Sequence, residues 1–206
     1  MTTPTRRIAI AAALSAMAFA AAPVGAVAQA AGDMSLGNPK AKVKMVEYAS
    51  LSCVHCAHFN NEVFPAFKKK YIDTGKVHYT LREVLTEPYQ VAAAGFMLAR
   101  CAGPEKYFTV VDAAFRGFDD MAKTGDARAN LLAAAKAGGL TEAQFIACVG
   151  DGAALEALQA RIAKSSEAAQ ISGTPTFFFN GKKVAEGAMS TIQLDAAVAA
   201  ALKAPR

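Results

Sequence analysis

The sequence predicts an α/β protein in which a strand–helix–strand unit is followed by a long helical insertion and then by a strand–strand–helix unit. Three observations predict this class. Segments rich in β-branched and aromatic residues, at 42–50 and 76–85, flank a stretch with helical periodicity. Apolar residues recur at helical spacing through nearly all of 88–171. The dipeptide Asn180-Gly181 then joins two short strand-like segments, as a tight hairpin turn requires.

Residues 1–30 have the layout of a secretory signal peptide. Two arginines precede an apolar run at 8–22, and small residues then offer cleavage sites after Ala28 or Ala30. A membrane anchor is the alternative, but this run is short for a helix that crosses a bilayer. We therefore expect the leader to be removed and the mature protein to be exported.

The charge and length of the remaining chain narrow the possible classes. The sequence has 22 basic and 17 acidic residues, a formal charge of +5, and loss of the two leader arginines lowers this surplus to +3. So small a surplus gives no reason to expect a nucleic-acid partner. A chain of this length fits one domain with an insertion and can bury a core without disulfides.

The strand expected at 42–50 runs straight into the segment that begins at Cys53. From there the apolar positions follow a helical period, and an Asp-Thr-Gly sequence ends the helix before the second strand at 76–85. Pro65 lies inside this helix and should kink it. Elements of these lengths form a βαβ unit with parallel strands and a right-handed crossover.

Capping signals mark the helices of the insertion and the last helix. Pro88 and Pro104 suit first-turn positions, and Asp126 can cap the helix that follows it. Capping boxes occur at Thr141–Gln144 and Ser190–Gln193. These signals predict several short helices in the insertion and one closing helix.

With the insertion set aside, the order of elements is that of a thioredoxin fold. The expected division of the chain follows from this order: a signal peptide at 1–30, a first half carrying the Cys-Val-His-Cys sequence at 31–86, the helical insertion at 87–171 and a second half at 172–206.

If the protein is exported, we expect the four cysteines to form two pairs, because thiols in an oxidising compartment pair unless something keeps them reduced. Cys101 and Cys148 each share a helical face with apolar residues of the insertion. We expect a structural disulfide between them, which closes a loop of 47 residues and contributes ~4 kcal/mol in the chain-entropy model. Two buried free thiols are the alternative.

The sequence Cys53-Val54-His55-Cys56 admits four interpretations. Haem attachment requires a histidine directly after the second cysteine, where Ala57 stands. A zinc or copper site could use both cysteines and a histidine, but no second close cysteine pair completes a set of four ligands. A purely structural disulfide here closes too small a loop to gain much stability. The fourth interpretation is a redox couple.

The local physics favours the redox couple. A strand that leads straight into a helix places Cys53 at the helix N-terminus, where unpaired N–H groups and the helix dipole stabilise a thiolate. We therefore expect a lowered pKa at Cys53, which makes it the attacking sulfur. Cys56 lies one turn further on, more buried, and resolves the mixed disulfide. We also expect the His55 imidazole to donate toward Cys53 and to favour the thiolate.

Together these features resemble the DsbA-like family of exported thiol-disulfide oxidoreductases. The resemblance covers essentially the whole mature chain and includes the Gly-Thr-Pro sequence that ends at Pro175. It implies that Pro175 forms a cis-proline loop against the active disulfide, with a trans edge proline as the alternative. It also implies that Glu47 is the buried acid beneath the site and shuttles the Cys56 proton. A solvated edge carboxylate is the alternative for Glu47.

The resemblance further implies a protein that donates disulfides to unfolded or reduced secreted clients. A DsbB-like membrane quinone reductase would reoxidise the Cys53–Cys56 pair, with no metal or organic cofactor. Val54, Thr174 and Pro175 would contact the client, which binds as an added strand.

Two positions depart from the family's best-known pattern, and they leave the direction of electron flow open. Val54 replaces a proline, and Thr174 stands where the oxidase group prefers valine. A reductase or isomerase with the same site is therefore an alternative. Only residues 31–41 precede the first expected strand, too few for the dimerisation domain usual in isomerases, and this favours the oxidase.

Overall fold

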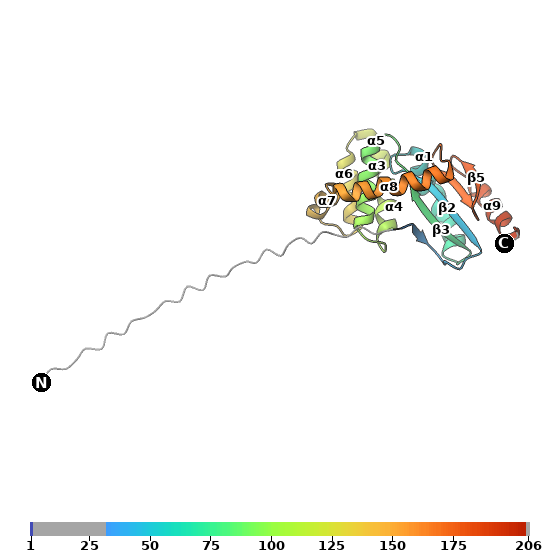
Figure 1. Ribbon diagram of the computed structural model, residues 1–206, viewed down its shortest axis with the longest axis horizontal. Helices are drawn as coiled ribbons and strands as arrows, with labels where there is room; N and C mark the ends of the chain where they lie inside the picture. Colours follow the sequence, from blue (N-terminus) through green and yellow to red (C-terminus); the bar gives the residue numbers. More distant parts are fainter. Residues whose placement is uncertain (2–31, 205–206) are drawn as a thin grey trace.

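The computed structural model describes Met1 and residues 32–204, so all of the expected leader except Met1 lies outside the described residues. The described chain is built around a five-stranded sheet in the order β1-β3-β2-β4-β5 (Figure 1). The strands are β1 (Met34–Leu36), β2 (Val43–Ala49), β3 (Val77–Glu83), β4 (Thr176–Phe179) and β5 (Lys182–Glu186). Strands β2 and β3 are parallel, and the other neighbouring pairs are antiparallel. The α/β class, with a βαβ unit and a hairpin in one sheet, is confirmed.

The helix that connects β2 to β3 changes its hydrogen-bonding pattern along its length. Its segments are α1 (Val54–His58), the π-helical η1 (Phe59–Val63), α2 (Phe64–Phe67) and the π-helical η2 (Lys68–Ile72). Pro65 has no N–H to donate and lies at the start of α2, directly after the first π-helical segment. The disturbance expected at Pro65 thus takes the form of π turns.

In the sequence, six helices separate β3 from β4, and in space most of them gather beside one end of the sheet (Figure 1). They are α3 (Tyr89–Cys101), α4 (Tyr107–Arg116), α5 (Phe118–Thr124), α6 (Ala127–Ala137), α7 (Glu142–Val149) and α8 (Gly152–Ala169). The long α8 runs from this cluster back across the sheet and contacts β3. None of the described helices combines the length and the apolar character needed to cross a bilayer.

Most of the expected caps are present. Asp126 accepts a hydrogen bond from the N–H of Ala129, and both capping boxes form, at Thr141 and at Ser190. The two prolines differ from the prediction. Pro88 is the N-cap of α3 rather than a first-turn residue, and Pro104 lies in the turn before α4.

Cys101 at the end of α3 and Cys148 in α7 form a disulfide, and both side chains are buried. The bond joins residues 47 positions apart, so it links two insertion helices that are distant in sequence. This pair leaves Cys53 and Cys56 as the free cysteines of the described chain.

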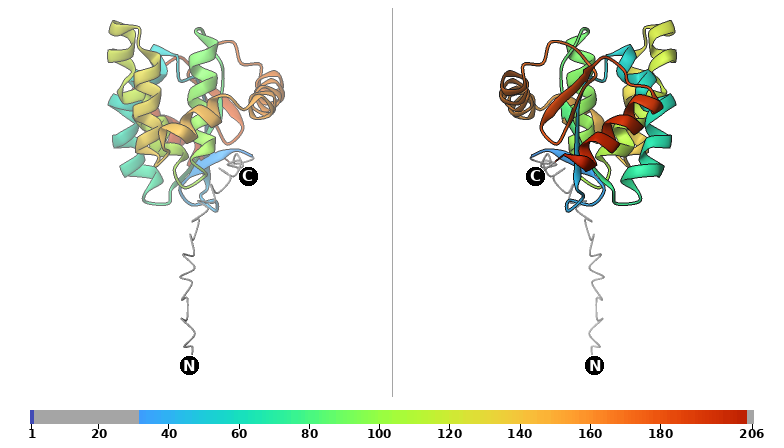
Figure 2. Two further views of the ribbon diagram at one scale, coloured as in Figure 1. Left: turned by 90° about the vertical axis from the view of Figure 1, so that its left-hand side faces the viewer. Right: turned by 90° about the vertical axis from the view of Figure 1, so that its right-hand side faces the viewer.

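The second half closes the sheet as the sequence predicts. Asn180 and Gly181 both have positive φ, 49° and 81°, which the tight turn between β4 and β5 requires. The last helix, α9 (Thr191–Lys203), packs on β2, β4 and α2. Figure 2 shows α8 on one side of the sheet and the α1–η2 helix on the other, so both faces are covered.

Strand β1 was not predicted, because the first strand was expected at 42–50. It is only three residues long, too short to show a period-two pattern, and it pairs antiparallel with β3. The hydroxyl groups of Ser35 and Thr80 are 2.8 Å apart across this pairing. The residues before β2 therefore contribute an edge strand to the same sheet.

Candidate active site

Cys53 is the N-cap of α1 and lies just beyond the carboxyl end of β2. Its backbone is extended, with φ −93° and ψ 117°, and its Sγ accepts a hydrogen bond from the backbone N–H of Cys56 at 3.3 Å. The sulfur therefore occupies the place that a capping oxygen usually fills, where the free N–H groups of the first turn converge. The Cys53 side chain is partly exposed, so a second sulfur can reach it.

The surroundings of Cys53 lower its pKa from an ordinary 9 to about 5. The largest cause is the hydrogen bond from the Cys56 side chain, which acts against the cost of partial burial. The Thr174 side chain and the backbone N–H groups of Cys56 and His55 lower the pKa further. At neutral pH the sulfur is therefore a thiolate, the nucleophilic form.

The expectation that the His55 imidazole donates toward Cys53 is wrong. The side chain is exposed, and within residues 32–204 no hydrogen bond joins the imidazole to Cys53 Sγ. His55 instead favours the thiolate through its backbone N–H, one of the first-turn donors of α1. The contribution belongs to the position at the helix N-terminus rather than to the imidazole.

Cys56 lies one turn into the helix and is fully buried. Burial raises the pKa of its thiol well above the ordinary value, and the neighbouring sulfur and Glu47 raise it further. The two cysteines are not bonded to each other, so the structure shows the dithiol form. One sulfur of the pair is thus acidic and accessible, and the other is protonated and enclosed.

The loop before β4 closes over Cys53. The Thr174–Pro175 peptide bond is cis, and the Thr174 carbonyl lies 3.4 Å from Cys53 Sγ. A carbonyl accepts only from the protonated thiol, so this contact favours the thiol, whereas the Thr174 side chain favours the thiolate. The Pro175 carbonyl accepts from the N–H of Gly187, which ties the loop to the end of β5. Val54, beside Cys53, is 55% exposed.

Glu47 of β2 is buried, so the alternative of a solvated carboxylate is wrong. The pKa of Glu47 is raised from 4.5 to about 8, and burial is the largest cause. The Tyr79 hydroxyl donates to the carboxylate at 2.6 Å and lowers this pKa, whereas the charge on Cys53 raises it. Sequence reasoning missed Tyr79. The register of β2 on β3 places Tyr79 on the same face of the sheet as Glu47, and that register has no signature in the sequence.

A family model described as Thioredoxin matches residues 29–200 of this sequence. The chain belongs to the thioredoxin superfamily. The match spans both halves of the sheet and the helical insertion, so it covers the site and the loop that closes over it.

Relatives in this superfamily carry names from thiol-disulfide chemistry. A Rickettsia conorii protein that bears the name of a protein-disulfide oxidoreductase is 36% identical over 161 residues, which are 78% of this chain and 57% of that protein. A Rickettsia bellii protein with the same type of name is 34% identical, over 78% of this chain and 61% of its own. The chain thus spans little more than half the length of these curated relatives.

Solved structures place the chain among DsbA-like members of the thioredoxin superfamily. The crystal structure of Wolbachia pipientis alpha-DsbA1 has 28% sequence identity and a TM-score of 0.65, over 82% of this chain and 92% of that one. A protein-disulfide isomerase from Novosphingobium aromaticivorans has a TM-score of 0.67 at 23% identity, over 84% and 98% of the two chains. At that identity the second likeness concerns the fold alone.

A buried cluster of hydroxyl groups supports the active-site turn of this thioredoxin-like fold, and sequence reasoning missed it. Ser52 donates to the Thr86 carbonyl at 2.7 Å, and the Thr86 hydroxyl lies 2.9 Å from that of Ser50. The cluster joins the turn after β2 to the segment after β3 and so fixes the approach of the chain to Cys53. Isolated serines and threonines in a loop give no periodic signal that would have identified it.

The metal-binding alternative gains no support from the geometry. Among residues 32–204 no group of three or more histidine, cysteine or acidic side chains is arranged to hold a metal ion. Cys53 Sγ lies between the helix N-terminus and the carbonyl of the cis-proline loop.

Proposed function

We propose that this protein is an exported thiol:disulfide oxidoreductase that donates disulfides to folding proteins through Cys53 and Cys56. The observation that carries the proposal is the asymmetry of the pair. Cys53 is accessible with a pKa of about 5, and Cys56 is enclosed with a raised pKa. An acidic thiol is a good leaving group, so a disulfide that contains it is readily transferred. The redox-active disulfide itself is the reactive group, and the chemistry needs neither a metal nor an organic cofactor.

The transfer consists of two exchange steps. A client thiolate attacks Cys53 Sγ of the oxidised pair, the bond to Cys56 breaks, and Cys56 leaves with the electron pair. A second client thiolate then attacks the client sulfur of the mixed disulfide, and Cys53 leaves as a thiolate. The client loses two electrons as its disulfide forms, and the two cysteines gain them. The stabilised Cys53 thiolate makes the second departure favourable.

Glu47 supplies the proton that the first step requires. With a pKa of about 8, this buried carboxyl is mostly protonated at neutral pH. Cys56 has a raised pKa and is electrostatically coupled to Glu47, so as it leaves it takes up a proton readily. Glu47 then acts as the local acid, and as the base when Cys56 must lose its proton during reoxidation.

The client binds along the loop that faces Cys53. Backbone groups beside Thr174 and Pro175 hold it as an added strand, and the exposed Val54 contacts its side chains. Main-chain hydrogen bonding of this kind is tolerant of sequence, which suits clients that are unfolded or reduced secreted proteins.

The reduced pair must be reoxidised, and we assign this step to a DsbB-like membrane quinone reductase. The proposed compartment is the periplasm, on the strength of the leader expected at 1–30 and of the similarity to DsbA proteins. A reductase or isomerase with the same site is the second candidate, because Thr174 precedes the cis-proline.

The direction of transfer is tested by mixing the oxidised protein with a reduced, unfolded substrate protein. We expect substrate thiols to disappear as the Cys53–Cys56 pair becomes reduced, and we expect the Cys53→Ser variant to be inactive. Equilibration with glutathione buffers gives the reduction potential. A strongly reducing potential, together with efficient reduction of insulin, would contradict the oxidase and favour the second candidate.

A further inference from the structure

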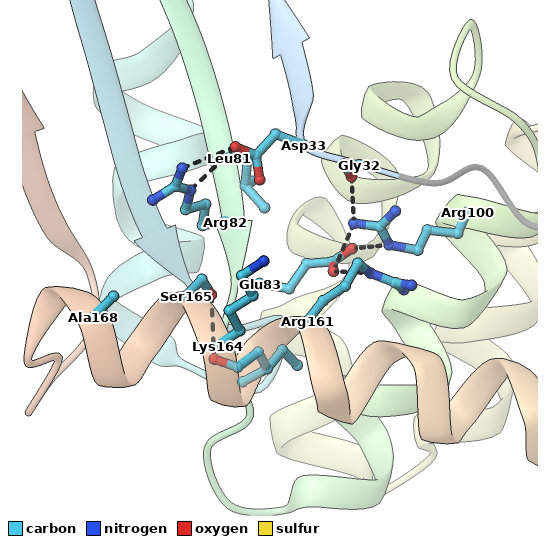
Figure 3. Close-up of a pocket in the computed structure, with 11 residues that line it drawn as sticks. Gly32, Asp33, Leu81, Arg82, Glu83, Arg100, Arg161, Lys164, Ser165 and Ala168 are labelled. Carbon is cyan, nitrogen blue, oxygen red and sulfur yellow. Dashed lines mark hydrogen bonds and ion pairs between the residues drawn. The ribbon is translucent and has the colours of Figure 1, made fainter.

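A cavity of about 480 Å³ lies between β3, α3 and α8, and the mechanism proposed above does not use it. Figure 3 shows its wall: the end of β3 on one side, α8 along another, and Arg100 entering from α3. The ionisable side chains that line it are Asp33, Arg82, Glu83, Arg100, Arg161 and Lys164. Four cationic groups thus face two carboxylates.

Two of the four cations are matched by the two carboxylates. Arg82 donates to Asp33 at 3.0 Å. Arg100 holds Glu83 through both carboxylate oxygens, at 2.6 and 2.8 Å, and this pair is almost completely buried. Glu83 also forms a long ion pair with Arg161 at 4.0 Å, so both acids are engaged and the cavity keeps a net surplus of two positive charges.

Arg161 is not satisfied by its surroundings. Its Nε and Nη2 are buried and have no hydrogen-bond partner among the described residues, and Nε lies 4.0 Å from the nearest Glu83 oxygen, beyond hydrogen-bond distance. Buried donors without partners are costly, and such a group in a native fold calls for an unseen partner. Arg161 lines the cavity, and its side chain as a whole is 29% exposed.

The two nitrogens without a hydrogen bond define the kind of partner. Nε and Nη2 form the edge of a guanidinium that binds two oxygens of a carboxylate or phosphate at once. Lys164 follows Arg161 by three residues on α8 and lines the same cavity, and no ion pair or hydrogen bond joins its Nζ to another described residue. The guanidinium of Arg161 is a forked donor and the ammonium group of Lys164 is a point charge. Together with the surplus of two positive charges, they match a small dianion.

We propose that this cavity is a binding site for a small, doubly charged oxyanion of the phosphate type, held by Arg161 and Lys164. No bond is made or broken at the site. The ligand supplies the hydrogen bonds that the guanidinium edge lacks and joins α8 to β3 and α3, so binding stabilises the folded protein. The site is separate from the Cys53–Cys56 pair and does not depend on the function proposed for it.

The test uses the folded full chain and inorganic phosphate as the probe. Titration calorimetry and thermal unfolding are followed with increasing phosphate, against sodium chloride at matched ionic strength and against acetate. We expect saturable phosphate binding and a rise in melting temperature that neither chloride nor acetate reproduces. Arg161→Gln should weaken phosphate binding about 10- to 100-fold, as expected for loss of charge-assisted hydrogen bonds.

Two further variants keep the result interpretable. Lys164 is exposed, so Lys164→Gln should fold normally, and we expect it to weaken binding by a smaller factor than Arg161→Gln. Arg116 is an exposed arginine paired with Asp112 outside the cavity, and Arg116→Gln should bind phosphate as the wild type does. Absence of saturable binding, an equal effect of chloride, or equal binding by wild type, Arg161→Gln and Lys164→Gln would overturn the proposal.

Discussion

The backbone N–H of Cys56 donates a hydrogen bond to Cys53 Sγ at 3.3 Å. This single relationship makes the first cysteine the cap of the helix that contains the second. Because the donor belongs to the backbone, any residue at position 56 other than proline would supply it. The Cys56 thiol adds the larger effect on the Cys53 pKa, so the redox partner is also the group that stabilises the thiolate.

Replacing Thr174 by valine should raise the pKa of Cys53. The Thr174 side chain favours the thiolate, whereas valine keeps the shape and removes the hydroxyl. Each pH unit by which this pKa rises destabilises the reduced form by ~1.4 kcal/mol and moves the reduction potential ~30 mV toward more reducing values. Equilibration of wild type and Thr174→Val with glutathione buffers measures the change. A more oxidising potential in the variant would contradict this role of Thr174.

Replacing His55 by alanine should change the pKa of Cys53 by less than about one pH unit, because an exposed charge in water has a small effect. The substitution keeps the backbone N–H through which His55 acts. The pKa is read from the rate of alkylation against pH. A rise of about two pH units or more, beyond what an exposed charge can cause, would show that the imidazole reaches the thiolate in solution.

Replacing Glu47 by glutamine should stabilise the reduced protein in a way that depends on pH. The unfolded carboxyl titrates near 4.5 and the folded one near 8, so between these values the folded state holds a proton that the unfolded state has released. The wild type therefore loses stability as pH rises through this window. Glutamine, which still accepts from Tyr79, does not titrate.

We expect the free energies of unfolding of wild type and Glu47→Gln to be similar near pH 4, below both pKa values, and to differ by a few kcal/mol near pH 8, with the variant more stable. The difference grows by about 1.4 kcal/mol for each pH unit crossed between the two pKa values. Urea denaturation across this range gives both curves. The exposed Glu62, replaced by glutamine, is the matched control. Parallel curves for wild type and Glu47→Gln would show that Glu47 titrates normally.

Removing the second disulfide should destabilise the fold without changing the active site. The bond between Cys101 and Cys148 spans 47 positions, and native disulfides of this kind contribute about 2–5 kcal/mol. We expect the Cys101→Ala/Cys148→Ala variant to unfold at lower denaturant concentration, with the Cys53 pKa unchanged. A changed pKa would mean that the insertion helices help to shape the redox site.

The elements that repeat a pattern over several residues were predictable from the sequence. Strands β2 and β3 and the helices of the insertion each show a period, and the hairpin at Asn180-Gly181 uses residues that tolerate positive φ. The Cys53–Cys56 site was also predictable, because a helix N-terminus after a buried strand follows from local order alone. Strand β1 was missed because three residues do not make a period.

Contacts between distant residues account for most of what was missed. Glu83 pairs with Arg100 across 17 positions and Tyr79 donates to Glu47 across 32, and neither spacing has a local signature. The error at His55 has a different cause, because there the sequence suggested a contact that the structure does not make. Its residue type suggested an imidazole contact, while the structure uses the backbone group that almost any residue at that position would provide.

Titration of Cys53 shows directly whether this sulfur is held as a thiolate at neutral pH. The ultraviolet absorbance of the reduced protein is followed against pH, with Cys53→Ala as the blank, and in parallel the rate of alkylation by a small reagent. We expect a midpoint of about 5 that is lost in the variant. A midpoint near the ordinary cysteine value of about 8.5, or a sulfur that small reagents cannot reach, would contradict this expectation.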